Sequence, residues 1–228
     1  MSLWAIVPVK PFGQGKSRLA KVLPHDRRKL LNSTMFTRTI RVLKSVPEIQ
    51  QIIVVSRDTS VLSIARSFEV KTIQEEGATE LNKAIARASF VSMAYQASSV
   101  IVIPSDLPLM EAKDISSLLM LRSEENEIII APDRKKEGTN ILYLNPPDTI
   151  GLKFGINSFQ NHIKQAEERN IKYTIVENPQ IALDIDIQQD LEFLRDEHHY
   201  AILEELMLDD IFYKINDGIE KNKEVVKP

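Results

Sequence analysis

The chain has 228 residues, of which 43% are hydrophobic and 27% are charged. These values are typical of a single water-soluble domain that is large enough to bury a core. The longest apolar stretches are of strand length, well short of the ~20 residues of a membrane-spanning helix, and the first residues do not follow the pattern of a signal peptide. We therefore expect a cytoplasmic protein without a membrane partner.

Charge and cysteine content narrow the function further. The net charge is −3, which argues against a nucleic-acid partner, because phosphate backbones are bound mainly through clustered Lys and Arg. The chain has no cysteine, and this excludes disulfides, thiolate nucleophiles, zinc–cysteine sites and iron–sulfur clusters. Oxygen ligands and the four histidines are left for any metal site.

The first expected element is a buried strand over residues 3–9, followed by a basic loop over residues 10–18. The loop carries the cations Lys10, Lys16 and Arg18 and the structure-breaking residues Pro11, Gly13 and Gly15. Glycine lets backbone amides approach an anion closely, so the loop indicates a phosphate site, with a basic surface turn as the alternative. It is not a Walker A motif, because Lys10 stands where GxxxxGK[ST] needs a glycine.

Further along, apolar runs of strand length alternate with segments of helical periodicity. The expected strands are 51–56, 70–73, 100–104, 127–131, 141–144 and 172–176, and the expected helices lie between Pro24 and Pro47 and over 58–67, 79–95, 112–122 and 158–169. Such alternation implies a mainly parallel sheet covered on both faces. The predicted fold class is α/β, a three-layer α/β/α sandwich, with the turns after Val9, Ile103 and Ala131 meeting in one crevice.

The end of the sequence predicts a helical extension. Its apolar side consists of Leu203, Leu206, Met207, Ile211 and Ile215. An apolar stripe of this kind packs on the parent domain or on a second subunit. We therefore divide the chain into a main domain, residues 1–195, and a C-terminal helical extension, residues 196–228, and we expect a homodimer. Residues 221–228 are expected to fray.

Three aspartates form a candidate metal site. Asp106 follows the apolar run 100–104 after a single residue, Ser105, and Asp184 and Asp186 stand two apart in LDID. In an extended segment, residues two apart project to the same face, so the three carboxylates can meet around one cation. Mg²⁺ favours such hard oxygen ligands and commonly binds carboxylates together with substrate phosphates. The alternative is that Asp106 caps a turn and that the other two acids are merely solvated.

Two further segments are candidate anion sites. Gly138, Thr139 and Asn140 form a loop that opens the apolar run at residue 141. Gly155 and Ser158 stand at the start of a helix, where free backbone amides favour a phosphate or carboxylate. Ser158 is alternatively an ordinary N-cap.

Asn82 and the histidines complete the candidates. Asn82, in the first turn of the helix 79–95, either hydrogen-bonds a base or ribose or caps the helix. His162, His198 and His199 are expected on helix surfaces, without a functional role.

Taken together, these motifs resemble the archaeal 2-phospho-L-lactate guanylyltransferase family over about residues 1–195. The resemblance is carried by VPVKPFGQGKSRLA at 7–20, ELNKA at 80–84, PSDLPL at 104–109, APDR and GTN within 131–140, FGINSF at 154–159 and LDIDIQQDL at 183–191. The family implies a nucleotidyltransferase with a nucleotide-diphospho-sugar transferase-like fold, acting in the biosynthesis of coenzyme F-420. One departure is the presence of Thr79 and Glu80 where the family has a tighter Gly-Leu-Asn turn.

The resemblance also implies roles for individual residues. Lys10, Gly13, Gly15, Lys16, Arg18, Asn82 and Asp106 match positions that bind the nucleotide, with Lys16, Arg18 and Asp106 as catalytic residues. Thr139, Gly155 and Ser158 match positions that hold the phosphorylated three-carbon acid. Asp106, Asp184 and Asp186 match the Mg²⁺ ligands. The departure at residues 79–80 weakens the match of Asn82.

The implied reaction transfers GMP from GTP to the phosphate of 2-phospho-L-lactate and releases pyrophosphate. An anionic phosphate nucleophile needs no general base, in accord with the absence of a His or Cys centre in the sequence. The alternatives are phosphoenolpyruvate as the acceptor, another nucleotidyltransferase acting on a sugar or cofactor precursor, and a nucleotide-binding protein without turnover.

Overall fold

The computed structural model describes residues 2–77, 80–123 and 126–208. Within them, a seven-stranded sheet has the order β3-β2-β1-β4-β6-β5-β7. The strands are β1 (Leu3–Pro8), β2 (Ile49–Ser56), β3 (Lys71–Gln74), β4 (Ser99–Val102), β5 (Glu127–Pro132), β6 (Thr139–Asn145) and β7 (Lys172–Ile175). The helices are η1 (Ser17–Leu19), α1 (His25–Lys44), α2 (Thr59–Ser67), α3 (Leu81–Ala94), α4 (Ala112–Leu119), α5 (Ser158–Glu168), α6 (Pro179–Ala182), α7 (Gln188–Asp196) and α8 (Tyr200–Glu205).

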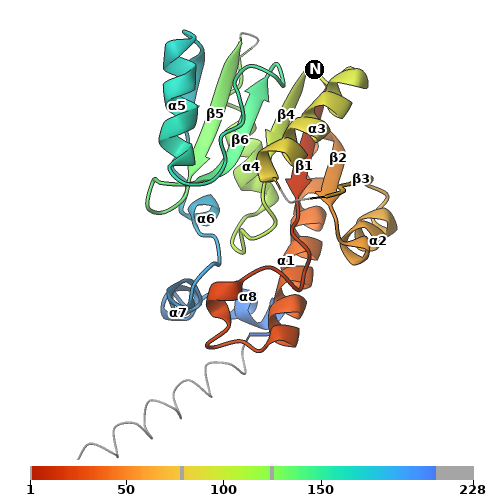
Figure 1. Cartoon of the computed structure of the whole chain (residues 1–228). Helices are drawn as coiled ribbons and strands as arrows, with labels where there is room; N and C mark the ends of the chain where they lie inside the picture. The colour runs from red at the N-terminus through yellow and green to blue at the C-terminus, as the bar shows by residue number, and fades with distance from the viewer. Residues whose placement is uncertain (1, 78–79, 124–125, 209–228) are drawn as a thin grey trace, which may run out of the picture.

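Helices cover both faces of the sheet (Figure 1). On one face, α1, α2 and α4 bury apolar side chains such as Phe36, Val61 and Ile115 against the strands. On the other face, α3 and α5 contribute Ile85 and Phe159. The predicted three-layer α/β/α sandwich is therefore confirmed.

The strand directions bring several loops to one edge of the sheet. β1 pairs in parallel with β2 and β4, and β5 pairs in parallel with β7. β6 runs antiparallel to both of its neighbours, β4 and β5. Because β6 is reversed, its first residues, Thr139 and Asn140, lie at the same edge as the carboxyl ends of β1, β4 and β5. A predicted mainly parallel mixed sheet is thus confirmed, with β6 as the reversed strand.

The C-terminal extension differs from the predicted helical run. α7 ends at Asp196, and α8 begins at Tyr200. Between them His198 adopts a left-handed backbone (φ 60°), which an α-helix cannot accommodate. The expected domain boundary after residue 195 falls inside α7. Ile211, Ile215 and the stretch 221–228 lie outside the described residues.

The described part of the extension packs on the main domain. Leu203 and Leu206 are 2% and 1% exposed. They belong to a third apolar cluster, together with Leu19, Leu23, Leu31, Met35, Leu109, Leu183, Ile185, Leu191, Leu194 and Leu208. This cluster lies at the end of the molecule where α7 and α8 meet the first turns of α1 (Figure 1). A homodimer stays a prediction. Among the described helices, none combines the length and hydropathy that crossing a membrane demands.

Candidate active site

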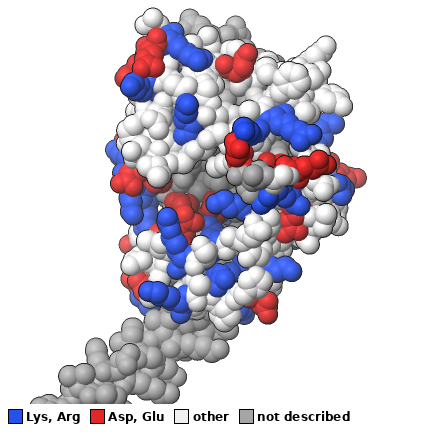
Figure 2. Space-filling view, in the orientation of Figure 1, with Lys and Arg blue, Asp and Glu red and all other residues white. Residues whose placement is uncertain are grey.

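A cavity of about 550 Å³ lies at the edge of the sheet where β1, β4 and β5 end. Each of the three turns that were expected to converge contributes to its wall, through Lys10, Asp106 and Asp133. The predicted crevice is therefore confirmed. On the face shown in Figure 2, acidic and basic side chains gather side by side across the middle of the molecule.

Most of the predicted site residues line this one cavity. They are Lys10, Gly15, Lys16, Arg18, Asp106, Thr139, Gly155, Ser158, Asp184 and Asp186. Gly13 and Asn82 are not part of its wall. Residues as far apart in the sequence as Lys10 and Asp186 thus share one site, as the motif set predicted.

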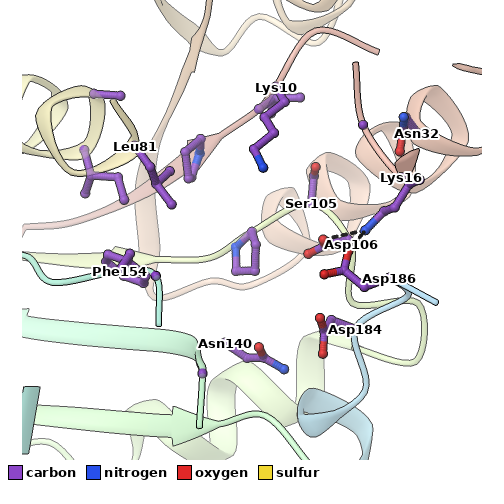
Figure 3. Close-up of a pocket in the computed structure, with 18 of the residues that line it drawn as sticks. Lys10, Lys16, Asn32, Leu81, Ser105, Asp106, Asn140, Phe154, Asp184 and Asp186 are labelled. Atoms are coloured by element: carbon purple, nitrogen blue, oxygen red, sulfur yellow. Dashed lines mark hydrogen bonds and ion pairs between the residues drawn. The ribbon is translucent and has the colours of Figure 1, made fainter. Parts of the chain in front are cut away.

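The side chain of Lys16 forms the centre of the site. Lys16 caps the short helix η1 in a left-handed conformation (φ 59°, ψ 36°), and its side chain is 6% exposed. The ammonium lies 2.7 Å from Asp106 Oδ2 and 3.0 Å from Asp186 Oδ1 (Figure 3). Burial lowers the pKa of Lys16, but the two carboxylates raise it more, so the net pKa is above its usual value and the ammonium stays charged.

Asp184 and Asp186 reach the cavity because the segment 183–186 is extended. Leu183 and Ile185, which alternate with the two aspartates, are fully buried. The predicted projection of both carboxylates to one face is therefore found. The backbone amide of Ile185 donates to the carbonyl of Asp106 (3.2 Å), which ties this segment to the loop after β4.

Asp184 is half-buried, and its carboxyl group has a shifted pKa. Burial raises its pKa to about 7, and the neighbouring carboxylates of Asp106 and Asp186 add to the increase. The ammonium of Lys16 opposes it. The cluster thus holds more negative charge than Lys16 alone balances.

The chemistry of this cluster fits Mg²⁺. All three acids offer hard oxygen donors, as Mg²⁺ prefers, and the uncompensated charge around Asp184 favours a further cation. Within the described residues, however, no three acidic or histidine side chains are already grouped as a metal site. Asp106 and Asp186 are instead bound to Lys16. Lys16 contacts one oxygen of each carboxylate, Asp106 Oδ2 and Asp186 Oδ1, so each of these acids has a second oxygen to offer to an ion.

Two residues that sequence reasoning missed hold the LDID segment in place. One carboxylate oxygen of Asp190 accepts the backbone amides of Asp186 (2.8 Å) and Ile187 (2.9 Å). Its other oxygen accepts from Arg134 (2.6 Å), which follows β5. In the sequence, Asp190 stands four residues after Asp186, a spacing that is compatible with its bonds to the two backbone amides. Its other partner, Arg134, is 56 residues away from Asp190 in the sequence.

Asn140 supports the same segment from the other side. Its side-chain amide donates to the carbonyls of Ile181 (2.9 Å) and Ala182 (3.1 Å) at the end of α6. Asn140 lies on the wall of the cavity beside Asp184 (Figure 3). The GTN motif therefore contributes a structural amide as well as Thr139.

The remaining loop cations, Lys10 and Arg18, are exposed and line the cavity. Within the part of the chain that the structure describes, neither has an acidic partner. Gly15 packs so closely on Asn32 that a Cβ there would lie 2.6 Å from the Asn32 amide nitrogen. The left-handed residue of the loop is Lys16 rather than Gly13 or Gly15.

The predicted acid-binding residues Thr139, Gly155 and Ser158 also line the cavity. Gly155 has φ +123°, a conformation that glycine alone adopts easily. The residue that caps α5 is Asn157, so the alternative role of Ser158 as an N-cap is wrong. The backbone amides of Ser158 and Phe159 already donate to protein carbonyls, which leaves the Ser158 side chain as the group this residue offers to the cavity.

Asn82 has a different role from the predicted base contact. Its side-chain oxygen accepts the amide of Phe154 (2.8 Å), and its side-chain nitrogen donates to the carbonyl of the same residue (3.1 Å). Both ends of the Asn82 amide are thus used to fix the loop before α5, and no cap is formed. Phe154 itself lines the cavity (Figure 3).

The expectation that His162 lies on a helix surface is wrong. The residue is fully buried. Its Nδ1 lies 3.0 Å from the Thr139 hydroxyl, and its Nε2 accepts the backbone amide of Lys153 at 3.0 Å. Burial lowers the pKa of His162 to about 4, so the ring is neutral near pH 7. His198 is exposed and His199 is half-buried.

Known proteins are similar to this chain in sequence. A family model described as "Guanylyl transferase CofC like" matches residues 3–217. Phosphoenolpyruvate guanylyltransferase of Rubrobacter xylanophilus is 35% identical over 84% of this chain and 92% of its own length. 2-Phospho-L-lactate guanylyltransferase of Methanocaldococcus jannaschii is 37% identical over 82% of this chain and 79% of its own length.

Solved structures share the fold at low sequence identity. A Desulfovibrio desulfuricans G20 protein assigned to the nucleotide-diphospho-sugar transferases has a TM-score of 0.72 at 15% identity, covering 97% of this chain and 98% of that one. A nucleotidyl transferase from Methanothermobacter has a TM-score of 0.65 at 14% identity, covering 88% and 99%. The nucleotide-diphospho-sugar transferase-like fold that the motifs implied is confirmed.

Proposed function

Since the chain belongs to the CofC-like guanylyltransferase family, we propose that it transfers GMP from GTP to the phosphate of 2-phospho-L-lactate, in the biosynthesis of coenzyme F-420. The main support is the single cavity that brings together Lys16, the carboxylates of Asp106, Asp184 and Asp186, and the hydroxyl of Thr139. Cations and acids for a magnesium–triphosphate lie at its centre, and neutral donors for a second anion lie beside them.

In the proposed reaction, a phosphate oxygen of the acid attacks the α-phosphorus of GTP. The new bond is a P–O–P bridge, and the bond from the α-phosphorus to the β-phosphate oxygen breaks. Pyrophosphate leaves with the electron pair of that bond. Since the attacking oxygen is already anionic at neutral pH, the site needs charge neutralisation and positioning rather than a proton acceptor.

The residues on the cavity wall divide these tasks. Lys10, Lys16 and Arg18 bind the triphosphate and offset the charge on the departing pyrophosphate. Asp106, Asp184 and Asp186 hold Mg²⁺, which when bound withdraws charge from the α-phosphate. Two unit charges ~4 Å apart in water interact by about 1 kcal/mol, and by several times more in a drier site, so cations between the two anionic substrates are essential.

The cavity wall offers groups for both substrates. It includes Glu75, whose carboxylate is an acceptor for the N1–H and N2–H donors that guanine has and adenine lacks. It also includes Thr139, Gly155 and Ser158. These residues donate hydrogen bonds to the acid without adding net positive charge.

Phosphoenolpyruvate is the second candidate acceptor. Relatives named for it and relatives named for 2-phospho-L-lactate match this chain at similar identity, 35% and 37%. The two acids carry the same phosphate and carboxylate, so the proposed mechanism applies to both.

A coupled assay for pyrophosphate tests the proposal. Purified protein receives GTP, Mg²⁺ and either 2-phospho-L-lactate or phosphoenolpyruvate, and we expect faster release with the lactate. Asp106→Asn should lower kcat by at least about a hundredfold, because a charged group that acts on the transition state is lost, while its circular dichroism spectrum stays that of the folded protein, because Asp186 remains as a counter-charge of Lys16. Faster turnover with phosphoenolpyruvate would establish the second candidate. GTP binding without pyrophosphate from either acid would favour a non-catalytic nucleotide-binding protein.

A further inference from the structure

The hydrogen bonds around His162 determine which of its ring nitrogens carries the proton. A backbone N–H can only donate, and the N–H of Lys153 points at Nε2 of His162 at 3.0 Å. Nε2 is therefore the unprotonated nitrogen. A neutral imidazole has one N–H, which must then be on Nδ1.

The neutral form is the one that this environment supports. His162 is fully buried, and its ring packs edge-on against Phe154, with ring centroids 5.0 Å apart. Within the described residues, no acidic side chain forms an ion pair with it. A charged ring would also carry a second N–H, at Nε2, facing the N–H of Lys153. The lowered pKa of His162, about 4, agrees with this.

The protonation of Nδ1 fixes the direction of the bond to Thr139. Nδ1–H donates to Thr139 Oγ1 over 3.0 Å, so the hydroxyl acts as acceptor there and its own hydrogen is left for another partner. Thr139 lines the cavity, and among the described residues its hydroxyl has no second partner. A hydroxyl that accepts one hydrogen bond is also a stronger donor in the next.

We propose that His162 is a positioning residue that fixes the Thr139 hydroxyl as a hydrogen-bond donor to an anionic oxygen of the acid substrate. The inference rests on the proposed function, which supplies the acid. It assigns the Thr139 hydroxyl a defined direction. At this point of the cavity, the hydroxyl binds a phosphate or carboxylate oxygen and disfavours a hydrogen-bond donor such as an ammonium group.

The protonation state can be measured without turnover. In ¹⁵N-labelled protein free of substrates, long-range ¹H–¹⁵N spectra distinguish protonated from unprotonated ring nitrogens, and loss of one set of signals in His162→Gln assigns the residue among the four histidines. We expect Nδ1 protonated and Nε2 unprotonated at pH 7. Protonation at Nε2 would overturn the inference, whether or not the protein proves to be a guanylyltransferase.

The second measurement tests whether His162 affects binding of the acid through Thr139. Thr139→Val and His162→Phe should each raise KM for the acid about tenfold, the size of a lost hydrogen bond to a charged group, and leave KM for GTP unchanged. The double variant should be no worse than Thr139→Val. If the increase in KM for the acid in the double variant equals the product of the increases in the two single variants, the inference is overturned.

Gln165→Leu is the matched control, because Gln165 lies one turn further along α5 and holds the same loop. Its side chain makes two hydrogen bonds to the backbone of Gly151, 3.0 and 2.9 Å long, but none to Thr139. KM for the acid should stay near wild type in this variant. A rise equal to that of His162→Phe would mean that His162 merely holds the loop, and would overturn the inference. If no acid is turned over, the dissociation constant of 2-phospho-L-lactate, measured by calorimetry, replaces KM in the same comparison of variants.

Discussion

At the scale of single residues, Lys16 combines a buried charge with an unfavourable backbone. A left-handed conformation costs a non-glycine residue about 1–2 kcal/mol, and a buried ammonium is stable only with close counter-charges. Asp106 and Asp186 supply those counter-charges at 2.7 and 3.0 Å. Backbone strain of this kind is kept where the surrounding contacts require it, as at binding sites. Lys16 is thus pre-placed between the acids that are proposed to hold the metal and the loop that is proposed to hold the triphosphate.

His162 makes stability depend on pH. Its pKa is 6.5 in the unfolded chain and about 4 in the folded one. Between these values the unfolded state binds more protons, so stability is greatest above pH 6.5 and decreases as the pH falls toward 4. The loss for this residue is about 3 kcal/mol. In urea unfolding at pH 7 and pH 4, we expect His162→Gln to lose about 3 kcal/mol less than wild type. Equal losses in the two proteins would contradict the buried, neutral histidine.

At the scale of elements, the site depends on how the segment 183–187 is held. Leu183 and Ile185 bury its apolar side, Asn140 holds its start, and Asp190 holds its end. No regular secondary structure contributes hydrogen bonds between α6 and α7. The positions of Asp184 and Asp186 therefore depend on a few side-chain contacts.

Asp190→Ala tests this dependence. The substitution removes the acceptor of two backbone amides and of Arg134, which should reduce the free energy of unfolding by about 1–3 kcal/mol and lower kcat by more than about tenfold. Chemical denaturation and the pyrophosphate assay measure the two effects. Asp196→Ala is the control, since Asp196 is an exposed acid of the same helix paired with Arg195, and we expect nearly wild-type values. Unchanged kcat in Asp190→Ala would show that the segment is held without it.

The sequence predicts the elements better than it predicts the contacts between them. Strand and helix positions follow from local periodicity, and so does the shared face of Asp184 and Asp186, which needs only an extended backbone. The roles of His162 and Asn140 depend on partners 23 and 41 residues away. Short-range patterns carry no information on such pairs. The ion pairs of Lys16 with Asp106 and Asp186, 90 and 170 residues away, were missed for the same reason. The burial of His162 is different, because this residue stands at helical spacing from Phe159 and Ala166 on the buried side of α5, and its local pattern is compatible with the core.

At the scale of the whole molecule, the C-terminal helices belong to the core of the site-bearing domain. Leu203, Leu206 and Leu208 share an apolar cluster with Leu183 and Ile185, the residues that flank Asp184. α8 thus packs against the segment 183–186 that carries Asp184 and Asp186. Residues 196–208, the described part of the extension, therefore pack as part of the main domain.

Removal of α8 tests this link. A chain that ends at residue 198 loses three buried leucines, and we expect its free energy of unfolding to fall by roughly 4–6 kcal/mol, with a lower kcat as the segment 183–186 loosens. A chain that ends at Leu208 keeps the cluster and is the control. Urea denaturation and the pyrophosphate assay on both chains give the comparison. Equal stability of the two truncated chains would show that α8 contributes nothing to this core.

In the proposed function, the chain directs an acid phosphate to the α-phosphorus of GTP. ³¹P NMR of a mixture of the protein, GTP, Mg²⁺ and 2-phospho-L-lactate follows every phosphorus atom at once. We expect the signals of GTP and of the acid to decrease together, while pyrophosphate and the two coupled signals of a P–O–P diester appear in equal amounts. Formation of GDP with inorganic phosphate, or an unchanged spectrum with both this acid and phosphoenolpyruvate, would contradict it.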